Sequence, residues 1–224
     1  DQKHLSRIAE INFSNAKKNP NSQTRNCSFT ENSFKNHDKE NPVIEGNTRK
    51  MDCGQITDGA AIIFLASDKR AKEYAKSRNI DIEKIPHIKG WGHKTGPISY
   101  QEKIEFSKDK DYIFPHVKET IEDAFRRANF SGVNDLDGIE THDCFTSTEY
   151  MAIDHFGITK AGESWKAIEL GEIEIGGRIP INPSGGLLGL GHPVGATGVR
   201  MLLDTYKQCF DTAGDYQVEG ANNF

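Results

Sequence analysis

The first candidate for acid–base chemistry is His192, which stands between Gly191 and Pro193. A tight glycine turn is expected to meet the N-terminus of a helix at this point. The positive end of a helix dipole favours a neutral imidazole, and a neutral imidazole can take a proton from a thiol. A lone histidine is more often a packed residue, but the surrounding glycines favour a functional one. We therefore predict that His192 is a catalytic base.

The segment around His192 is rich in glycine. Six glycines lie between Gly185 and Gly198, a density that indicates positive φ or close backbone approach at several points. A phosphate-binding loop is the rival interpretation. No Gly-Lys-Ser/Thr follows Gly189-Leu-Gly191, which excludes a Walker site, and Val194 stands where the dinucleotide fingerprint needs glycine.

The second constellation is His142-Asp-Cys-Phe145. Taken alone, it fits a metal-binding pair, a Cys–His nucleophilic couple or the ordinary end of a buried strand. Alternation along a strand places His142 and Cys144 on one side and Asp143 on the other. Zinc is disfavoured, since no third ligand lies at a recognised spacing.

Helices and strands must position these residues. The apolar spacing from Val117 to Ala128 predicts a helix over residues 112–129. A strand over residues 136–141 would then deliver His142 at its C-terminal end, and a helix with Glu149 in its first turn should begin near Ser147. Another helix is expected over residues 194–210, with Pro193 at its start. Its predicted buried face consists of Val199, Leu202, Leu203 and Tyr206.

The fold class predicted from these elements is α/β. The near-continuous apolar run over residues 58–66 is typical of a strand that is buried on both faces. A helix over residues 70–79 and a short strand over 85–91 follow it. Before this run, residues 1–50 are polar, with only a short amphipathic helix at Leu5 to Phe13, and they hold little apolar surface for a core of their own.

Composition limits the class of partner. The net charge is −5, and the basic residues are scattered rather than gathered, which argues against nucleic acid. Mean hydropathy is −0.65 and no apolar run reaches the ~18 residues of a membrane span. No apolar signal region opens the chain. The four cysteines form no close pair in sequence, so we expect reduced thiols in an intracellular protein.

Three motifs together resemble the thiolase superfamily. Asn182-Pro-Ser-Gly-Gly followed by Gly191-His-Pro-Val-Gly-Ala-Thr-Gly198 is similar to its Gly-His-Pro block. His142-Asp-Cys-Phe145 resembles the motif that replaces Asn-Glu-Ala-Phe in the sterol-carrier-protein type of thiolase. Asp58-Gly-Ala-Ala61 resembles the entry to the last strand of the thiolase N-terminal half. The order and spacing agree over nearly the whole chain.

The resemblance implies an acyl-CoA C-acyltransferase with the layered α/β thiolase-like fold, present here in part. Residues 1–50 would be a polar loop-region segment, 51–79 the end of the N-terminal half, and 80–224 the C-terminal half without its last strands. His192 would activate the nucleophile, and His142 would position a water in the oxyanion hole. The floor of the pocket would be shaped by Asn182, Ser184, Gly185 and Gly186.

The same resemblance implies a coenzyme A thioester as substrate, no covalently bound cofactor, no metal, and a homodimer or homotetramer in the cytoplasm or peroxisome. It places the nucleophilic cysteine upstream of Asp1 and a Cys-x-Gly motif beyond Phe224, so the chain alone is expected to be inactive. Two alternatives stay open: an aldolase without the cysteine that works with a partner domain, and a non-catalytic subunit that binds acyl-CoA.

Overall fold

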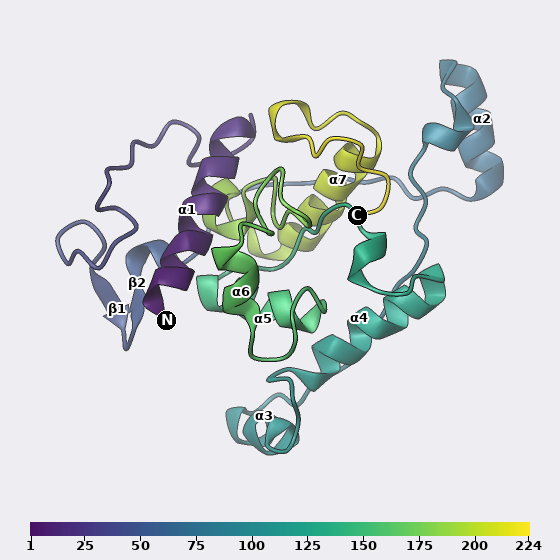
Figure 1. The fold of residues 1–224 in the computed structure, drawn as a ribbon. Coiled ribbons are helices and arrows are strands. Elements are labelled where there is room, and N and C mark those ends of the chain that lie inside the picture. Colours follow the sequence, from purple (N-terminus) through teal and green to yellow (C-terminus); the bar gives the residue numbers. More distant parts are fainter.

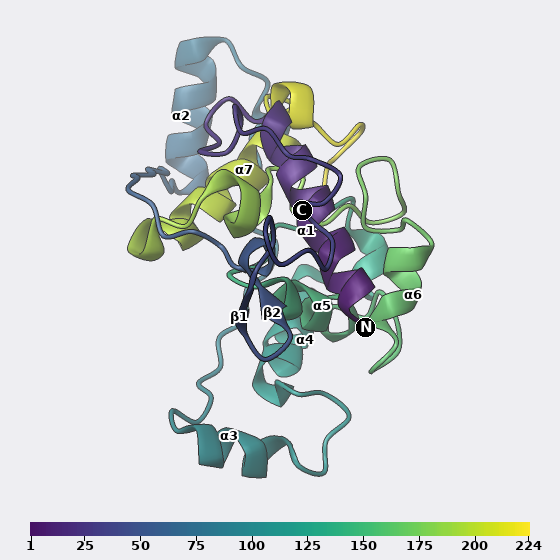
Figure 2. The same ribbon diagram turned by 90° about the vertical axis from the view of Figure 1, so that its left-hand side faces the viewer.

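The computed structural model describes residues 1–224, and its core is built around the first helix, α1 (Gln2–Lys18). Ile8 and Ala9 are fully buried, and α1 packs on α5 (Thr146–His155), α6 (Ser164–Glu169) and the turn Gly186–Leu190. Figures 1 and 2 both show α1 lying across this part of the molecule. The apolar residues of α1 therefore belong to a core that is shared with later elements, not to a core of the segment's own.

The buried side of α1 also carries asparagines, and the residue that follows the helix is another. Asn12, Asn15 and Asn19 are buried, and each donates a side-chain hydrogen bond to the rest of the protein. A buried polar group costs little once it is hydrogen-bonded. These polar side chains therefore belong to the buried side of the helix, although the segment is polar in sequence. The core cluster contains Ile8, Ala9, Ile11, Phe13, Val133, Ile139, Ile153, Ile158, Ala167, Ile168, Ile173, Ile179, Ile181 and Leu188.

Three predicted helices are present with small changes of boundary. α2 spans Asp68–Arg78 and α4 spans Pro115–Ala128. Proline fits the first turn of a helix, and Asn129 closes α4 in the left-handed conformation, with φ of 59°. α5 begins at Thr146 and holds Glu149 in its first turn, as predicted.

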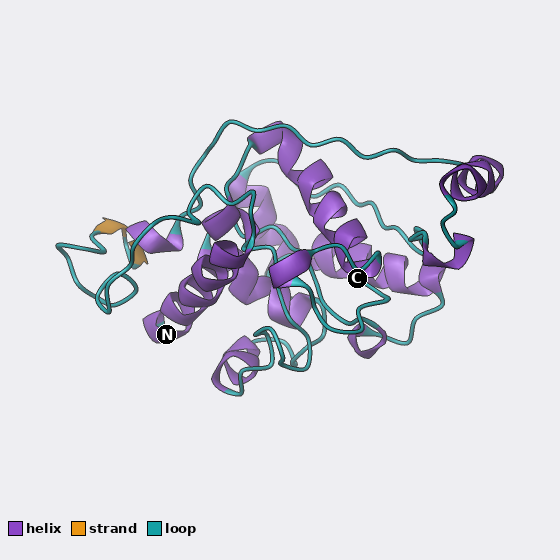
Figure 3. Cartoon of the chain, turned by 90° about the horizontal axis from the view of Figure 1, so that it is seen from above, coloured by secondary structure: helices purple, strands orange, loops and turns teal.

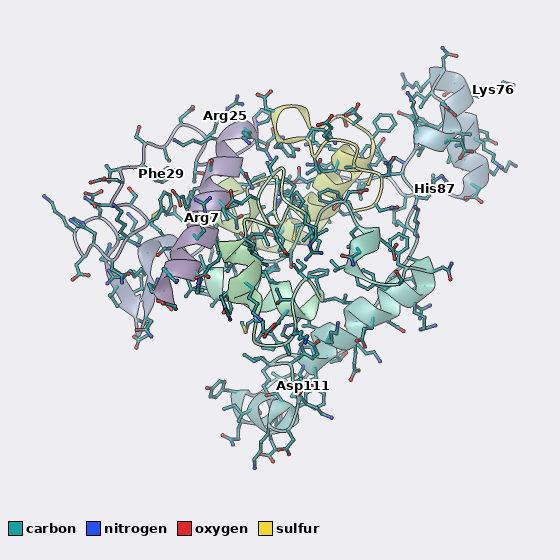
Figure 4. All side chains as sticks on the ribbon, viewed as in Figure 1. Arg7, Arg25, Phe29, Lys76, His87 and Asp111 are labelled. Carbon is teal, nitrogen blue, oxygen red and sulfur yellow. The ribbon has the colours of Figure 1, made fainter.

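α3 (Tyr100–Ser107) was not predicted, although Ser99 and Glu102 form a capping box at its start. Together with α2, it stands away from the central body in Figure 1. Lys76 on α2 and Asp111 beyond α3 lie at the margins of the molecule in Figure 4.

The predicted strands do not form. The one sheet is a small antiparallel pair, β1 (Val43–Glu45) and β2 (Thr48–Arg49), at one side of the molecule (Figure 3). Residues 58–66 are irregular, and Phe64 is 91% exposed. Residues 85–91 lie against α4, where a Cβ on Gly90 would come within 2.1 Å of the carbonyl oxygen of Ala124. Only a parallel bridge between Ile139 and Ile181 marks the strand expected at 136–141.

A strand needs neighbours to bond its N–H and C=O groups. Within residues 1–224 none of the three segments finds a neighbouring strand over its length, so an apolar run with strand character stays irregular. The composition of these segments is typical of strands, but the prediction that they form hydrogen-bonded strands was wrong for this chain.

The last helix, α7 (Thr197–Cys209), follows a 3-10 turn over Val194–Ala196. Its buried face is opposite to the predicted one. Thr197, Arg200, Asp204 and Gln208 are buried, whereas Val199 and Leu202 are more than one third exposed. The polar face is buried because Arg200 and Gln208 find hydrogen-bond partners inside the protein.

None of the helices combines the length and the apolar character that crossing a bilayer requires.

Candidate functional site

The two predicted catalytic histidines meet in space. The ring centroids of His142 and His192 are 5.3 Å apart and their planes stand at 86°, an edge-to-face approach. His142 follows the bridge residue Ile139, and His192 follows the glycine turn and bridges to Ile56. Two motifs far apart in the sequence therefore deliver their imidazoles to one place.

The backbone of His192 is held on both sides. Its N–H donates to the carbonyl of Gln55, and its carbonyl accepts from the N–H of Thr57, both at 3.2 Å. Gly191 before it has φ of +128°, and a Cβ there would lie 3.0 Å from the Thr57 hydroxyl. The turn into His192 therefore requires glycine on both conformational and steric grounds.

The ring of His192 is oriented by Thr197. Nδ1 of His192 lies 2.7 Å from the Thr197 hydroxyl, which is itself almost completely buried at the start of α7. With Nδ1 engaged in this hydrogen bond, Nε2 is the nitrogen that remains for a substrate or a nucleophile. Thr197 was not singled out from the sequence, although a hydroxyl five residues after a candidate base at a helix start is a usable signal.

His142 is the more exposed of the two rings. Partial burial lowers its pKa, and the nearby His192 ring and the positive charge of Arg200 lower it further. The imidazole of His142 is therefore neutral at neutral pH and can donate one hydrogen bond while accepting another.

The four predicted pocket residues, Asn182, Ser184, Gly185 and Gly186, are all buried. Asn182 accepts the N–H of Thr141 at 2.8 Å, directly before His142, and donates to Glu149 at 2.8 Å. These residues lie beside the segment that leads to His142. Their predicted part in shaping a pocket floor remains a prediction.

Asp143 lies on the opposite side from His142, buried in the core. Its carboxylate accepts the N–H groups of Leu187 at 2.6 Å and Leu188 at 3.2 Å, together with the amide of Asn12 at 2.9 Å. Burial raises the pKa of Asp143 to about 6, against the lowering effect of the hydrogen bonds from Leu187 and Leu188. At neutral pH the carboxylate is therefore mostly ionised.

Two further buried carboxyls lie around the site. Glu149 accepts the amides of Asn12 at 2.6 Å and Asn182 at 2.8 Å. Glu140 accepts the N–H and the hydroxyl of Ser184. Burial raises the pKa of each carboxyl to about 8, with Asp143 adding to the effect at Glu149 and Asp204 at Glu140. Both carboxyls are therefore largely neutral at pH 7.

Sequence reasoning missed most of this buried network. Asn12 and Arg200 are its unassigned donors: Arg200 donates to Ser184 at 3.0 Å and pairs with Asp204 at 3.1 Å. A usable signal was present, because Asn12 lies between Ile11 and Phe13 on the apolar face of α1, and Arg200 and Asp204 are spaced i, i+4 on α7.

The four cysteines are unbonded. Burial raises the thiol pKa of Cys53 and of Cys209, which makes both poor thiolates. No three His, Cys, Asp or Glu side chains are grouped as a metal site would need. The chemistry that the site offers is thus proton transfer and hydrogen bonding by two imidazoles.

Comparison with known proteins shows similarity both to a family model and to individual proteins. Residues 99–223 match the family model described as "Thiolase C-terminal domain-like". The acetyl-CoA acetyltransferase of Methanothermobacter thermautotrophicus is 30% identical over 98% of this chain and 53% of its own length. The sterol carrier protein 2 of Oryctolagus cuniculus is 31% identical over 97% of this chain and 38% of its own length. The chain thus spans about half the length of these relatives, or less.

A solved structure described as "Ltp2-ChsH2(DUF35) aldolase" has a similar fold. Its TM-score is 0.74 at 20% identity, over 99% of this chain and 53% of the solved one. This likeness concerns the fold alone, and it confirms the predicted α/β thiolase-like class, present in part. By the match over more than half of its residues, the chain belongs to the thiolase family.

Proposed function

We propose that the full-length protein is an acyl-CoA C-acyltransferase of the thiolase type, and that this chain is its C-terminal part. The reaction is thiolysis of a 3-ketoacyl-CoA or the reverse Claisen condensation, within lipid metabolism. The substrate is a coenzyme A thioester, and no cofactor is covalently bound. The observation that carries the proposal is the approach of His142 and His192 to 5.3 Å between ring centroids, each from a separate motif.

In this proposal His192 is the base. Its Nε2 removes the proton of a cysteine thiol that another part of the full-length protein supplies. The thiolate attacks the carbonyl carbon of the substrate, and the tetrahedral intermediate breaks a carbon–carbon or carbon–sulfur bond. The proton on His192 then passes to the leaving carbanion or thiolate. Thr197 holds the ring in the orientation that this transfer needs.

His142 stabilises charge. A neutral imidazole beside the base holds a water, and that water donates to the oxygen that becomes negative. The floor of the pocket is formed by Asn182, Ser184, Gly185 and Gly186. Asn182 and Ser184 support the segment before His142 through hydrogen bonds to Thr141 and Glu140. The proposal includes a homodimer or homotetramer located in the cytoplasm or peroxisome.

Variants of the two histidines test the assignment in the full-length protein. His192→Ala is expected to lower the rate of acyl transfer on the order of 10²–10⁴-fold, the range for loss of general acid–base catalysis. His142→Ala is expected to cost about 3 kcal/mol of transition-state stabilisation. His142→Asn should be mild, since an amide can hold the same water. Single-turnover acylation and the melting midpoint are measured for all three variants. Equal losses for His142→Asn and His142→Ala, or losses that only follow stability, would contradict the assignment.

The second candidate is an aldolase of the same fold that lacks the cysteine and works with a partner domain. One observation favours it: a solved structure whose fold matches over 99% of this chain is described as an aldolase. Mass spectrometry after incubation with acyl-CoA separates the two. An acyl adduct on a cysteine supports the acyltransferase. Carbon–carbon cleavage without coenzyme A as a reactant supports the aldolase, and binding without turnover would leave a non-catalytic subunit.

A further inference from the structure

The carboxylate of Asp143 joins three separate parts of the chain. It follows His142 directly, and it binds the backbone of the turn Gly186–Leu190 and the side chain of Asn12 on α1. Asp143 is completely buried, so nothing in solvent competes for its oxygens. All three groups that it binds are N–H donors. An ionised carboxylate has two oxygens and no donor, which suits three donors better than an amide would.

The turn is shaped around this carboxylate. Gly186 has φ of +60°, and a Cβ on it would lie 2.2 Å from Oδ2 of Asp143. On the other side, Gly185 has φ of +103°, and a Cβ there would lie 2.6 Å from Ala16 on α1. The backbone is therefore confined between α1 and Asp143, with no room for a side chain at either position.

The other end of the turn leads directly to His192. Leu187 and Leu188, whose N–H groups bind Asp143, are buried, and Gly191 then turns the chain toward Gln55 and Thr57. The segment that carries His142 and the turn that leads to His192 are thus joined through a single side chain next in sequence to His142.

We propose that Asp143 is a positioning residue that sets the separation of His142 and His192 by holding the glycine turn to the segment that carries His142. It touches neither the substrate nor the reacting atoms. The role assigned to it rests on the proposed function only in so far as the two histidines act together; the geometry that Asp143 holds is a property of the fold.

The test uses Asp143→Asn in the full-length protein, with Asp154→Asn as the matched control. Asp154 is also buried and also accepts a backbone N–H, from Gly162 at 2.8 Å, but at the far end of α5. Asn in place of Asp143 turns an NH₂ toward donors, so the turn loses at least one charge-assisted hydrogen bond. Hydrogen exchange of the Leu187 and Leu188 amides is expected to accelerate by about tenfold or more.

Two further readouts separate positioning from a merely structural role. The ring nitrogen signals of both His142 and His192 should shift in Asp143→Asn. Neither signal should shift in Asp154→Asn. The turnover number should fall on the order of 10–100-fold, the effect of misplaced groups, with KM changed by less than about twofold. Equal behaviour of the two variants would overturn the proposal.

The unmodified protein keeps the proposal testable if Asp143→Asn does not fold. The N–H groups of Leu187 and Leu188 have Asp143 as their hydrogen-bond partner. Exchange of these amides at the rate of an open turn in the unmodified protein would overturn the proposal at once. Amide exchange and ring signals can be measured without turnover. If the protein shows no acyl transfer but the turn loosens in Asp143→Asn, the proposed function is contradicted and the positioning role is retained.

Discussion

The site depends on the contact that orients the His192 ring. The Thr197 hydroxyl, 2.7 Å from Nδ1 of His192, is the side-chain partner of that ring, and it lies in the first turn of α7. A hydrogen bond to one ring nitrogen decides which tautomer is present and which nitrogen faces the reaction. At this scale, therefore, Thr197 controls how His192 is presented, and Asp143 controls where it stands.

Thr197→Val removes the hydroxyl and keeps the shape of the side chain. We expect single-turnover acylation in the full-length protein to fall by about tenfold or more, because the ring loses its orientation. Thr197→Ser keeps the hydroxyl and is expected to react at close to the parent rate. Ring nitrogen signals of His192 should shift in the valine variant alone. A valine variant with the parent's rate and unchanged signals would show that Thr197 merely packs.

At the scale of elements, α7 and the stretch before α2 share one feature, which is exposed apolar surface. Ile62, Phe64 and Leu65 are exposed on the irregular stretch, and Val194, Val199 and Leu202 on and before α7. Exposed apolar side chains such as these are available to pack against another chain or segment. The polar side of α7 is turned inward, where Arg200 donates to Asp204 and Ser184 and lies 3.6 Å from Glu140.

This surface predicts association of the isolated chain. At micromolar concentration, light scattering should report species larger than the 25.0 kDa monomer. Replacing Ile62 and Phe64 by Ser should reduce association, because it removes two strongly exposed apolar groups of the stretch. Ile98→Ser is the control, since Ile98 is similarly exposed but lies on the segment before α3. A monodisperse monomer before any substitution would contradict the prediction.

At the scale of the whole molecule, a buried polar network ties the parts together. Asn12 of α1, Glu149 of α5 and Asn182 before the glycine turn form one hydrogen-bonded group. Next to it, Glu140, Ser184 and Arg200 connect the turn to α7. The protein core is thus held by hydrogen bonds between buried polar groups as well as by its apolar cluster.

The buried carboxyls make stability depend on pH. In the folded protein the pKa of Glu149 and of Glu140 is about 8, against 4.5 for an ordinary glutamate, so the folded state binds these protons more tightly. Stability contributed by the neutral carboxyls is full below about pH 4.5 and is lost as pH rises to about 8. His142 opposes this below about pH 6.5, because its pKa is lowered on folding.

We therefore expect the free energy of unfolding, from urea titrations between pH 5 and 9, to fall on the alkaline side. Glu149→Gln stays neutral at every pH and should flatten the decline. Glu163→Gln is the control: its carboxylate is exposed, and hydrogen bonding to Lys166 lowers its pKa, so it is ionised throughout this range. An unchanged slope in Glu149→Gln would mean that this carboxyl does not carry the dependence.

The sequence by itself determined the family, the two histidine motifs and the helices whose signals are local. The start and end of α4 follow from Pro115 and Asn129, and the start of α5 is marked by Glu149 in its first turn, because caps and 3.6-residue periodicity act within a few residues. The division at residues 50 and 79 stays a prediction.

Tertiary structure decided what depends on partners distant in sequence. The stretch at 58–66 has strand composition but no neighbour to bond its backbone, so it remains irregular. Periodicity showed that α7 is amphipathic, yet only Glu140, Ser184 and Tyr216 decided that its polar face is the buried one. The 5.3 Å between the histidines depends on Asp143, Gly186 and Thr57, and contacts across such sequence distances leave no periodic pattern along the chain.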